Sequence, residues 1–361
     1  MKGKEFLLLG LIMLIPVIFV SGCVQGPGMQ MIFGSMGQEK EAPPDVLKIQ
    51  SVTVVPNPPI TSNSNFEISF QVVNVGKAEQ GDKAAKDVKA FIYDWGLCSP
   101  IDSNGNVIRE KEIPGIDGQP VDIYPGGAEL VTQDFKTPTN EELGNMEGTC
   151  PIRFRVEYGY DAHSTTTLTL ISQDRLREAA RAGESLSVSP TTTKSRGPIK
   201  IDLSVDSTQP VRSDMVIPVT VKVEDVGTGL YQQVDTNSLV LTFPSDFDVT
   251  CYPKEWIGSA VQSGDSKQVR NIKPITLIQG QTPAIRCDLK YKGPEITNMK
   301  TFTVRAYMDY VYKVYGDTSV TVKPTYQPLP FEGSSNEGQA STGTENEGGS
   351  ESQGTEGGES P

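Results

Sequence analysis

The sequence contains few of the residues that most often carry out catalysis or bind metal ions. Its 361 residues include one histidine, His163, and five cysteines, no two of which are spaced as CxxC. His163 falls in a predicted hairpin turn, and no serine lies within a GxSxG segment, the motif that places a nucleophile on a sharp turn in many hydrolases. We therefore predict no catalytic residues, no metal site and no cofactor, and we do not expect an enzyme.

Clusters of basic residues are also scarce. The formal net charge is −13, of which residues 332–361 contribute −7 through seven glutamates and no basic residue. Residues 1–22 carry +1, so residues 23–331 carry −7. A nucleic-acid-binding surface needs clustered Lys and Arg to neutralise phosphates. Nucleic acid is therefore not an expected partner.

The first 23 residues have the organisation of an export leader. Lys2 and Lys4 precede an apolar run, Phe6–Val20, and small residues lead directly to Cys23, as in leaders that are removed after export. The segment Val-Ser-Gly-Cys that ends at Cys23 resembles the lipobox of prokaryotic lipoproteins. This resemblance implies that residues 1–22 are removed and that the sulfur of Cys23 carries a lipid.

An uncleaved membrane anchor is the alternative interpretation of the leader. The apolar run is shorter than the ~20 residues that cross a bilayer, and Pro16 interrupts it, which favours cleavage. Both interpretations place the rest of the chain on the extracytoplasmic face of the cell membrane, because lysines that precede the run stay on the cytoplasmic side. The membrane is therefore an expected partner.

The four other cysteines indicate disulfides, because an even number in an exported chain is typical of a disulfide framework. They are Cys98, Cys150, Cys251 and Cys287. Three connectivities are possible, and the repeat described next places two cysteines in each half, which favours the pairs Cys98–Cys150 and Cys251–Cys287. Zinc binding is a weak alternative in a chain with a single histidine.

Two segments about 150 residues apart share one pattern. Phe66–Val72 alternates apolar with polar residues and is followed by Asn-Val-Gly at 74–76. Ile217–Val223 alternates in the same way and is followed by Asp-Val-Gly at 225–227. Alternation with a period of two buries one face of a segment and predicts a β-strand. The chain is therefore predicted to contain two similar halves.

The remainder of both halves is also typical of β-structure. Short apolar runs are separated by clusters of Gly, Pro, Asn and Asp, and the late segment Phe154–Val156 matches Val304–Ala306. These features predict an all-β fold of two tandem antiparallel β-sandwiches.

The alternating strand that ends in Asn-Val-Gly or Asp-Val-Gly, after a proline-containing turn, resembles the CARDB-type, immunoglobulin-like modules of prokaryotic surface proteins. The layout of lipobox, paired sandwiches and acidic Ser/Gly tail is similar to that of archaeal envelope lipoproteins. The resemblance covers most of residues 46–325 and implies immunoglobulin-like sandwiches that act in adhesion, as spacers or in binding partners. It implies no catalytic residues, and neither half has the Cys…Trp…Cys spacing of antibody domains.

The predicted organisation has six parts. They are the lipoprotein leader (1–22), a linker (23–45), the first β-sandwich (46–172), a short helix with a hinge (173–197), the second β-sandwich (198–326) and an acidic Ser/Gly/Glu tail (327–361). Ser172 or Asp174 can cap the helix and Gly183 can end it. The helix is interpreted as a connector, with docking to a partner or to anionic headgroups as the alternative. The tail is too poor in apolar residues to fold and is predicted to be a disordered spacer, with O-glycosylation or contact with cations or a cell wall as alternatives.

Four tyrosines near the end of the second half are possible ligand-facing residues. They are Tyr307, Tyr310, Tyr312 and Tyr315. In a strand, Tyr310 and Tyr312 share one face, and Tyr307 and Tyr315 share the other. Exposed aromatic side chains could stack on sugar rings or anchor a protein partner, whereas buried ones would fill a sandwich core. The Asx-rich segment 102–106 is predicted to be a turn, because its glycine does not stand where a calcium loop requires one.

The expected function is that of a membrane-anchored, extracytoplasmic lipoprotein that is not an enzyme. It would present its sandwiches for adhesion or for scaffolding a protein complex, with the membrane and an unidentified envelope or surface protein as partners. The alternative is an extracytoplasmic protein that binds a small molecule or a glycan through the tyrosine-rich face.

Overall fold

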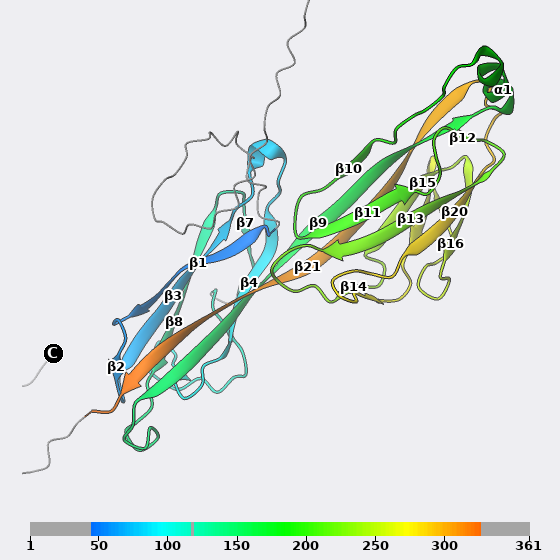
Figure 1. Cartoon of the computed structure of the whole chain (residues 1–361). Coiled ribbons are helices and arrows are strands. Elements are labelled where there is room, and N and C mark those ends of the chain that lie inside the picture. The colour runs from blue at the N-terminus through cyan, green and yellow to red at the C-terminus, as the bar shows by residue number, and fades with distance from the viewer. Residues whose placement is uncertain (1–44, 117–118, 326–361) are drawn as a thin grey trace, which may run out of the picture. The chain divides into compact units, whose positions relative to one another are not determined.

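The computed structural model describes residues 45–116 and 119–325 (Figure 1). Within these residues nearly all regular structure is β-strand, with one α-helix, α1 (Gln173–Ala182), and one 3-10 helix, η1 (Ala78–Gln80). The prediction of an all-β, largely antiparallel fold is confirmed. The predicted leader, the lipidation site Cys23 and the predicted tail lie outside the described residues. Among the helices described, none is long and apolar enough to cross a membrane.

Two four-stranded sheets have the same strand order and correspond to the two halves of the repeat. The first has the order β1 (Leu47–Val55), β3 (Asn65–Asn74), β8 (Ala128–Lys136) and β5 (Ser99–Pro100). The second has the order β11 (Ile199–Val205), β13 (Val216–Asp225), β20 (Ile285–Tyr291) and β16 (Phe247–Tyr252). The alternating segments of the sequence form β3 and β13, and their apolar side chains are buried at every second position as predicted.

The third sheet is organised around two long strands, β9 (Gly148–Ile171) and β21 (Met299–Lys323). They pair antiparallel along the whole of β9 and form a two-stranded ribbon, called the ribbon below, which runs through the centre of Figure 1. The sheet continues beside β9 with β4 (Ala85–Asp94) and β6 (Ile113–Pro114), and beside β21 with β15 (Leu239–Pro244), β18 (Ser266–Arg270) and β17 (Val261–Ser263). The short strands β2 (Ile60–Thr61), β7 (Val121–Ile123), β10 (Thr192–Lys194) and β12 (Val211–Arg212) pair along the edges of this sheet. The remaining strands, β14 (Gln233–Val234) and β19 (Ile275–Thr276), pair with each other.

Each four-stranded sheet packs against one part of the ribbon, which gives two lobes. In lobe 1 the Phe70 ring of β3 stacks on Phe154 of β9, with 4.2 Å between the ring centroids. In lobe 2 the Phe247 ring of β16 meets Phe302 of β21 at 4.9 Å. Lobe 1 comprises the first four-stranded sheet, β4, β6, β7 and ribbon residues 148–160 and 310–323. Lobe 2 comprises the second four-stranded sheet, β15, β17, β18 and ribbon residues 161–171 and 299–309.

Each long strand therefore begins in one lobe and ends in the other. Residues 161–171 follow the first predicted sandwich in sequence but lie in lobe 2, and residues 310–323 follow the second but lie in lobe 1. The division predicted at residues 173–197 differs from this arrangement, because the lobes exchange strands across it. An alternating pattern cannot show where a strand passes from one core into the next.

β9 and β21 occupy equivalent places in the two halves. Val211 of β12 pairs in parallel with Leu170 near the end of β9. Ile60 of β2 pairs in parallel with Val322 near the end of β21. Leu170 of β9 therefore corresponds to Val322 of β21. Leu170 lies in lobe 2, where β21 begins, and Val322 lies in lobe 1, where β9 begins.

The same correspondence corrects the alignment of the late strands. It aligns Phe154 with Ala306, whereas the sequence pattern matched Phe154 with Val304, and it aligns Tyr160 with Tyr312. The predicted match is thus displaced by one pleat. A shift of two residues leaves an alternating pattern unchanged, so the pattern alone cannot reveal the displacement.

Helix α1 and the segment after it join β9 to β11. Ser172 is the N-cap, with its Oγ accepting from the backbone N–H of Arg175 at 3.1 Å, and Gly183 ends the helix with a φ of 68°. The predicted cap and end are confirmed. After the helix, β10 pairs antiparallel with Ser164–Thr166 of β9. The segment predicted as a hinge therefore lies along the ribbon.

Candidate functional site

Two disulfides stabilise the lobes, in the predicted pairs. Cys98–Cys150 connects the residue before β5 to β9 in lobe 1, with an S–S distance of 2.16 Å. Cys251–Cys287 joins directly opposite residues of β16 and β20 in lobe 2, with an S–S distance of 2.07 Å. The first bridge therefore links two sheets, whereas the second lies within one sheet.

The four candidate ligand-facing tyrosines divide between the two faces of β21. Tyr310 is 4% exposed and Tyr312 is 0% exposed, whereas Tyr307 and Tyr315 are 40% and 42% exposed. Tyr310 and Tyr312 are therefore core residues and do not face a ligand, which corrects that part of the prediction. The two-residue period had placed the pairs on opposite faces, but only sheet packing decides which face is buried.

Buried tyrosines fill the core where the two lobes meet at the centre of the ribbon. Tyr158 lies opposite Tyr312 and Tyr160 lies opposite Tyr310, with ring centroids 5.8 and 6.3 Å apart in edge-to-face arrangements. Tyr231 adds a fifth ring, 5.6 Å from that of Tyr310. Burial raises the pKa of all five phenols. These hydroxyls therefore remain protonated at neutral pH.

Two of the tyrosine hydroxyls bind the loops that follow β3 and β13. The Tyr312 hydroxyl donates to Asp225 Oδ1 at 3.0 Å and accepts from the backbone N–H of Gly229 at 3.0 Å. The Tyr160 hydroxyl accepts from the backbone N–H of Lys83 at 3.2 Å. Each loop is thus held on the ribbon by a tyrosine from an equivalent position.

The repeated Asx-Val-Gly motif shapes these two loops. Asn74 Oδ1 accepts from the Gly76 N–H at 2.9 Å, and Asp225 Oδ1 accepts from the Gly227 N–H at 3.1 Å, which makes an Asx turn in both halves. Burial raises the pKa of the Asp225 carboxyl, although hydrogen bonds from Tyr312 and from backbone amides oppose the rise. The motif therefore has a structural role: it ends a strand and turns the loop toward the ribbon.

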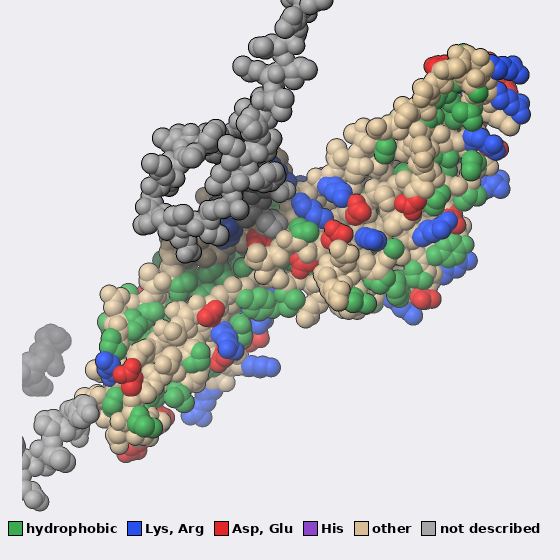
Figure 2. All heavy atoms as spheres, viewed as in Figure 1, with side chains coloured by type: hydrophobic (Ala, Val, Ile, Leu, Met, Phe, Trp, Pro, Cys, Tyr) green, Lys and Arg blue, Asp and Glu red, His purple; other side chains and the backbone are tan. Residues whose placement is uncertain are grey.

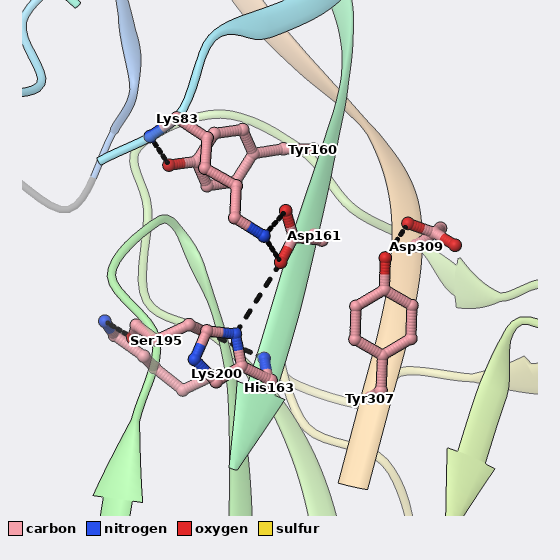
Figure 3. Close-up of polar contacts among 8 residues, drawn as sticks. All are labelled: Lys83, Tyr160, Asp161, His163, Ser195, Lys200, Tyr307 and Asp309. Carbon is pink, nitrogen blue, oxygen red and sulfur yellow. Dashed lines mark hydrogen bonds and ion pairs between the residues drawn. The ribbon is translucent and has the colours of Figure 1, made fainter. Parts of the chain in front are cut away.

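The outward face of the ribbon centre carries a polar cluster drawn from both long strands (Figure 3). Asp161 lies opposite Asp309, and His163 lies opposite Tyr307. Two carboxylates placed opposite each other repel, and Lys83 of lobe 1 supplies a cation to this pair. Its Nζ lies 2.8 Å from both carboxylate oxygens of Asp161.

His163 and Tyr307 complete the polar cluster. His163 Nδ1 lies 3.6 Å from Asp161 Oδ2, so Asp161 is shared between Lys83 and the imidazole. Tyr307 donates its hydroxyl proton to Asp309 Oδ1 at 2.6 Å. Burial, together with this hydrogen bond, raises the pKa of the Tyr307 phenol. Both carboxylates of the cluster thus have a hydrogen-bond donor.

Ser195, His163 and Asp161 are the residue types of a hydrolase triad, but their geometry is different. A triad needs the serine hydroxyl hydrogen-bonded to the imidazole. Ser195 Oγ instead accepts from the backbone N–H of His163 at 2.9 Å, and the Ser195 N–H donates to the His163 carbonyl at 2.8 Å. Lys200 Nζ donates to the Ser195 carbonyl at 2.8 Å. The serine therefore holds the end of β10 on β9.

A groove of about 220 Å³ lies beside the polar cluster, between the loop after β3 and the segment after β10. Charged residues in its walls are paired, with Arg196 Nη1 3.6 Å from Asp82 Oδ2 and Lys194 Nζ 2.7 Å from Asp202 Oδ1. Pockets for drug-sized ligands are larger, about 300–1,000 Å³, and mostly apolar. The pairs Arg196–Asp82 and Lys83–Asp161, called the latch below, instead tie lobe 1 to lobe 2.

Lobe 1 carries an aromatic and cationic patch on the outer face of the long sheet, of which sequence reasoning identified only Tyr315. The Arg155 guanidinium makes two hydrogen bonds to Glu112, at 2.7 and 2.8 Å, and lies 4.8 Å from the Phe91 ring centroid. Tyr315 lies opposite Arg155 in the ribbon and meets Tyr93 edge-on at 6.3 Å. The hydrogen bonds from Arg155 lower the pKa of Glu112. The two-residue period can indicate that Arg155 and Tyr315 point outward from their strands. It cannot indicate that the two residues lie side by side in the sheet.

Charges of both signs are mixed over the remaining surface in the view shown. Figure 2 shows Lys/Arg and Asp/Glu side chains interspersed on the visible face. Asp102 forms the predicted Asx turn, with Oδ1 accepting from the backbone N–H groups of Asn104 at 2.9 Å and Asn106 at 2.8 Å, and hydrogen bonds from Asn106 lower the Asp102 pKa. Within residues 45–116 and 119–325, no group of three or more His, Cys, Asp or Glu side chains is placed to hold a metal ion.

Comparisons with known proteins add no functional argument. No protein-family model and no curated protein matches the chain. Among solved structures, the chain is similar to the Fcho1 Mu homology domain of Danio rerio with bound Eps15 peptide, at 9% identity and a TM-score of 0.19, over 49% of this chain and 88% of that one. It is also similar to the secreted serine protease VesC from Vibrio cholerae, at 7% identity and a TM-score of 0.16, over 73% of this chain and half of that one. Such low TM-scores support no inference.

Proposed function

We propose that the chain is an exported, membrane-anchored protein without enzymatic activity, which scaffolds partner proteins through two immunoglobulin-like lobes held as one unit. The observation that carries the proposal is the ribbon, because β9 and β21 pair without interruption through both lobes. A strand shared by two cores fixes the geometry of those cores relative to each other. Fixed geometry is what a scaffold needs.

The junction between the lobes resists bending for two physical reasons. Bending would break backbone hydrogen bonds of the ribbon and would expose the tyrosine cluster, in which Tyr158 and Tyr312 are 0% exposed. Complete burial of one large apolar side chain contributes about 1.5–3 kcal/mol. The latch adds two ion pairs across the same junction. Modules joined by an ordinary linker would instead move relative to each other.

The proposed location is supported by the disulfides and by the leader. Disulfides persist in oxidising compartments outside the cytoplasm, and both cysteine pairs lie at bonding distance. The lipobox-like segment before Cys23 supports attachment to the membrane through a lipid.

Intact mass analysis of the full chain, expressed in a prokaryotic host that processes lipoproteins and purified from its membranes, tests the location. The expected polypeptide begins at Cys23, carries an acyl group and contains two disulfides. The matched control is Cys23→Ser, which should leave the membrane fraction. A retained leader with the C23S variant still in the membrane would identify an uncleaved anchor, and a cytosolic chain with free thiols would overturn the proposal.

Partner capture at native abundance tests the scaffolding role. The tagged chain is cross-linked in intact cells and recovered from membranes, and a protein that co-purifies in fixed ratio is expected. The C23S variant, made at the same level, shows which captured proteins depend on membrane attachment. A chain recovered alone under these conditions would refute scaffolding.

Binding of a glycan or small molecule is the second candidate function, and the aromatic patch of lobe 1 favours it. Tyr315, Tyr93 and Phe91 lie together with Arg155 on one sheet face, and such rings can stack on sugars. Titration with a panel of oligosaccharides, followed by tyrosine fluorescence, tests it with Tyr315→Ala as the variant. Tyr307→Ala is the matched control, because Tyr307 has nearly the same exposure but lies outside the patch.

A further inference from the structure

One edge of β21 pairs with β9, and the backbone groups of its other edge point away from β9. In lobe 1 this other edge contains a stretch that no described strand covers. At the two ends of this stretch, the Lys313 carbonyl accepts from the Leu230 N–H at 2.8 Å, and the Lys323 carbonyl accepts from the Ser62 N–H at 2.8 Å. Backbone groups point to the same side at every second residue of a strand. The residues between that share this direction are Tyr315, Asp317, Ser319 and Thr321. In the parallel pairing of β2, Ile60 lies opposite Val322, so its backbone groups meet those of Thr321 and Lys323. Among the described residues no strand pairs with this side of Tyr315, Asp317 and Ser319, and we call residues 315–321 the open edge.

The equivalent edge of β9 in lobe 2 is covered by the chain itself. β10 pairs with Ser164–Thr166, and β12 pairs with Leu170 and Ile171. Between them the side-chain amide of Gln209 accepts from the Thr169 N–H at 2.9 Å and donates to the Thr167 carbonyl at 3.0 Å. Covering an edge in this way prevents pairing with other chains. Three separate devices therefore close this edge.

Lobe 1 keeps one of these devices and lacks the second. β2 covers the end of β21 as β12 covers the end of β9. Pro58 precedes β2 by the same interval as Gln209 precedes β12, but proline has no side-chain amide to offer the open edge. The backbone groups that Gln209 satisfies in lobe 2 thus have no such cap in lobe 1.

The chain segment that precedes β1 is poorly suited to act as the third device. Pro43 stands before β1 at the place that Ser195 has before β11. The Ser195 N–H donates to the His163 carbonyl at 2.8 Å, whereas proline has no N–H.

The β21 strand of a second copy does not fit the open edge either, because it would have to continue past both ends of the stretch. Leu230 bridges Lys313 at one end, and β2 pairs with Val322 and Lys323 at the other. These neighbours limit the occupant to an extended segment of about seven residues, one for each residue of the opposing strand.

We propose that the open edge, residues 315–321 of β21, binds a short extended peptide segment of a partner protein by strand addition. That the peptide belongs to a partner protein rests on the proposed scaffolding function. Alternate peptide side chains would lie beside Gly316, Thr318 and the buried Val320, which calls for apolar residues. The intervening side chains would lie on the face of Asp317, which calls for a basic residue.

The probe is the labelled peptide acetyl-TVTVKIT-amide, whose lysine falls opposite Asp317 when its seven residues pair antiparallel with 315–321. The charge-swapped control is acetyl-TVTVEIT-amide. Fluorescence anisotropy with the full chain and intact disulfides should give micromolar affinity, with the lysine peptide bound about threefold more tightly, as expected for one cross-strand charge pair. Asp317→Lys should reverse this preference. Equal binding of both peptides to both proteins would overturn the assigned register.

Two backbone variants test the edge itself. Ser319→Pro removes an outward N–H and leaves the pairing with β9 intact, so binding should weaken about tenfold, whereas Ser319→Thr should bind as the wild type does. Pro58→Gln introduces the cap that Gln209 provides in lobe 2 and should also weaken binding. If S319P does not fold, P58Q and the two peptides, measured on the wild type and on Asp317→Lys, still test the proposal. Unchanged binding in S319P and P58Q would overturn the proposal.

Amide exchange separates a partner peptide from coverage by the chain's own segment. In the free protein the N–H groups of Asp317 and Ser319 should exchange fast and become protected by the peptide, whereas slow exchange without peptide would show an edge already covered and would overturn the proposal. A captured native partner without peptide binding would refute the edge but not scaffolding. Peptide binding without any captured partner would support the edge and refute scaffolding.

Discussion

Replacing Gly227 by alanine tests how tightly the loop after β13 is packed on the ribbon. A β-carbon at this glycine would overlap the Tyr312 hydroxyl, and it would lie 2.5 Å from Asp45 Oδ1 and 2.6 Å from Pro198 Cβ. Real β-carbons do not approach other atoms so closely, so the loop must move or Tyr312 must leave its position.

The magnitude follows from two contributions that overlap. Overpacking in a closed core costs about 1–3 kcal/mol. Displacing Tyr312 would also break its 3.0 Å hydrogen bond to Asp225, and hydrogen bonds to charged groups contribute about 1.5–3 kcal/mol. We expect Gly227→Ala to lower the free energy of unfolding by about 3 kcal/mol in all.

The repeat supplies a matched control, Gly76→Ala, in the same motif of lobe 1. A β-carbon there would lie 2.9 Å from Asn74 Oδ1 and 3.1 Å from Asp82 Cβ, farther than any of the three contacts at Gly227. Its cost should stay near or below about 1 kcal/mol. Urea denaturation with intact disulfides, followed by tyrosine and tryptophan fluorescence, measures both.

A double substitution locates the cause of the effect. Tyr312→Phe removes the hydroxyl that the new methyl group meets, so the cost of G227A with Y312F should be less than the sum of the single costs, by more than about 1 kcal/mol. Strictly additive costs, or a Gly76→Ala variant as unstable as Gly227→Ala, would refute the packing argument.

Three further predictions concern stability. Removing either disulfide by paired Cys→Ala substitutions should cost about 4 kcal/mol in the chain-entropy model, for loops of 52 and 36 residues, and urea denaturation that shows no loss would contradict it. Burial raises the pKa of Asp225 above its ordinary 3.8, so the folded state binds this proton more tightly, and the free energy of unfolding should fall as pH rises from 3.8 through the raised value. Asp225→Asn should remove that slope, and an unchanged pH profile would show that another group causes it. Lys83→Ala should cost about 0.5–1 kcal/mol, more at low salt, because Asp161 then faces Asp309 without its cation. The exposed Lys323→Ala, whose ion pair spans 4.0 Å, should cost close to nothing, and equal costs would argue against the latch.

The parts of the fold that depend on local pattern were predictable. Alternation from Phe66 and from Ile217 identified β3 and β13, and Ser172 with Gly183 identified both ends of α1. An even cysteine count, divided by the repeat, identified the disulfide pairs. Each of these features is set by the chemistry of neighbouring residues, or by a count that folding does not change.

The candidate sites were less predictable, because they depend on which segments meet. The period of two placed Tyr310 and Tyr315 on opposite faces of the strand, but it could not show which face is buried. Arg155 and Tyr93 gave no signal, since their contact requires β4, β9 and β21 to lie in one sheet. The displaced match at Phe154 had the same origin, because an alternating strand looks alike after a shift of two residues.

By itself, the sequence determined that this protein is built of strands in two similar halves, because side-chain alternation and turn residues act over a few positions. Only the tertiary structure decided that β9 and β21 each pass from one lobe into the other, that tyrosines fill the junction and that no described strand covers one edge of β21 in lobe 1. The physical reason is that a strand's hydrogen bonds are completed by whichever segment lies beside it. That neighbour is chosen by the packing of the whole chain and not by the strand's own residues.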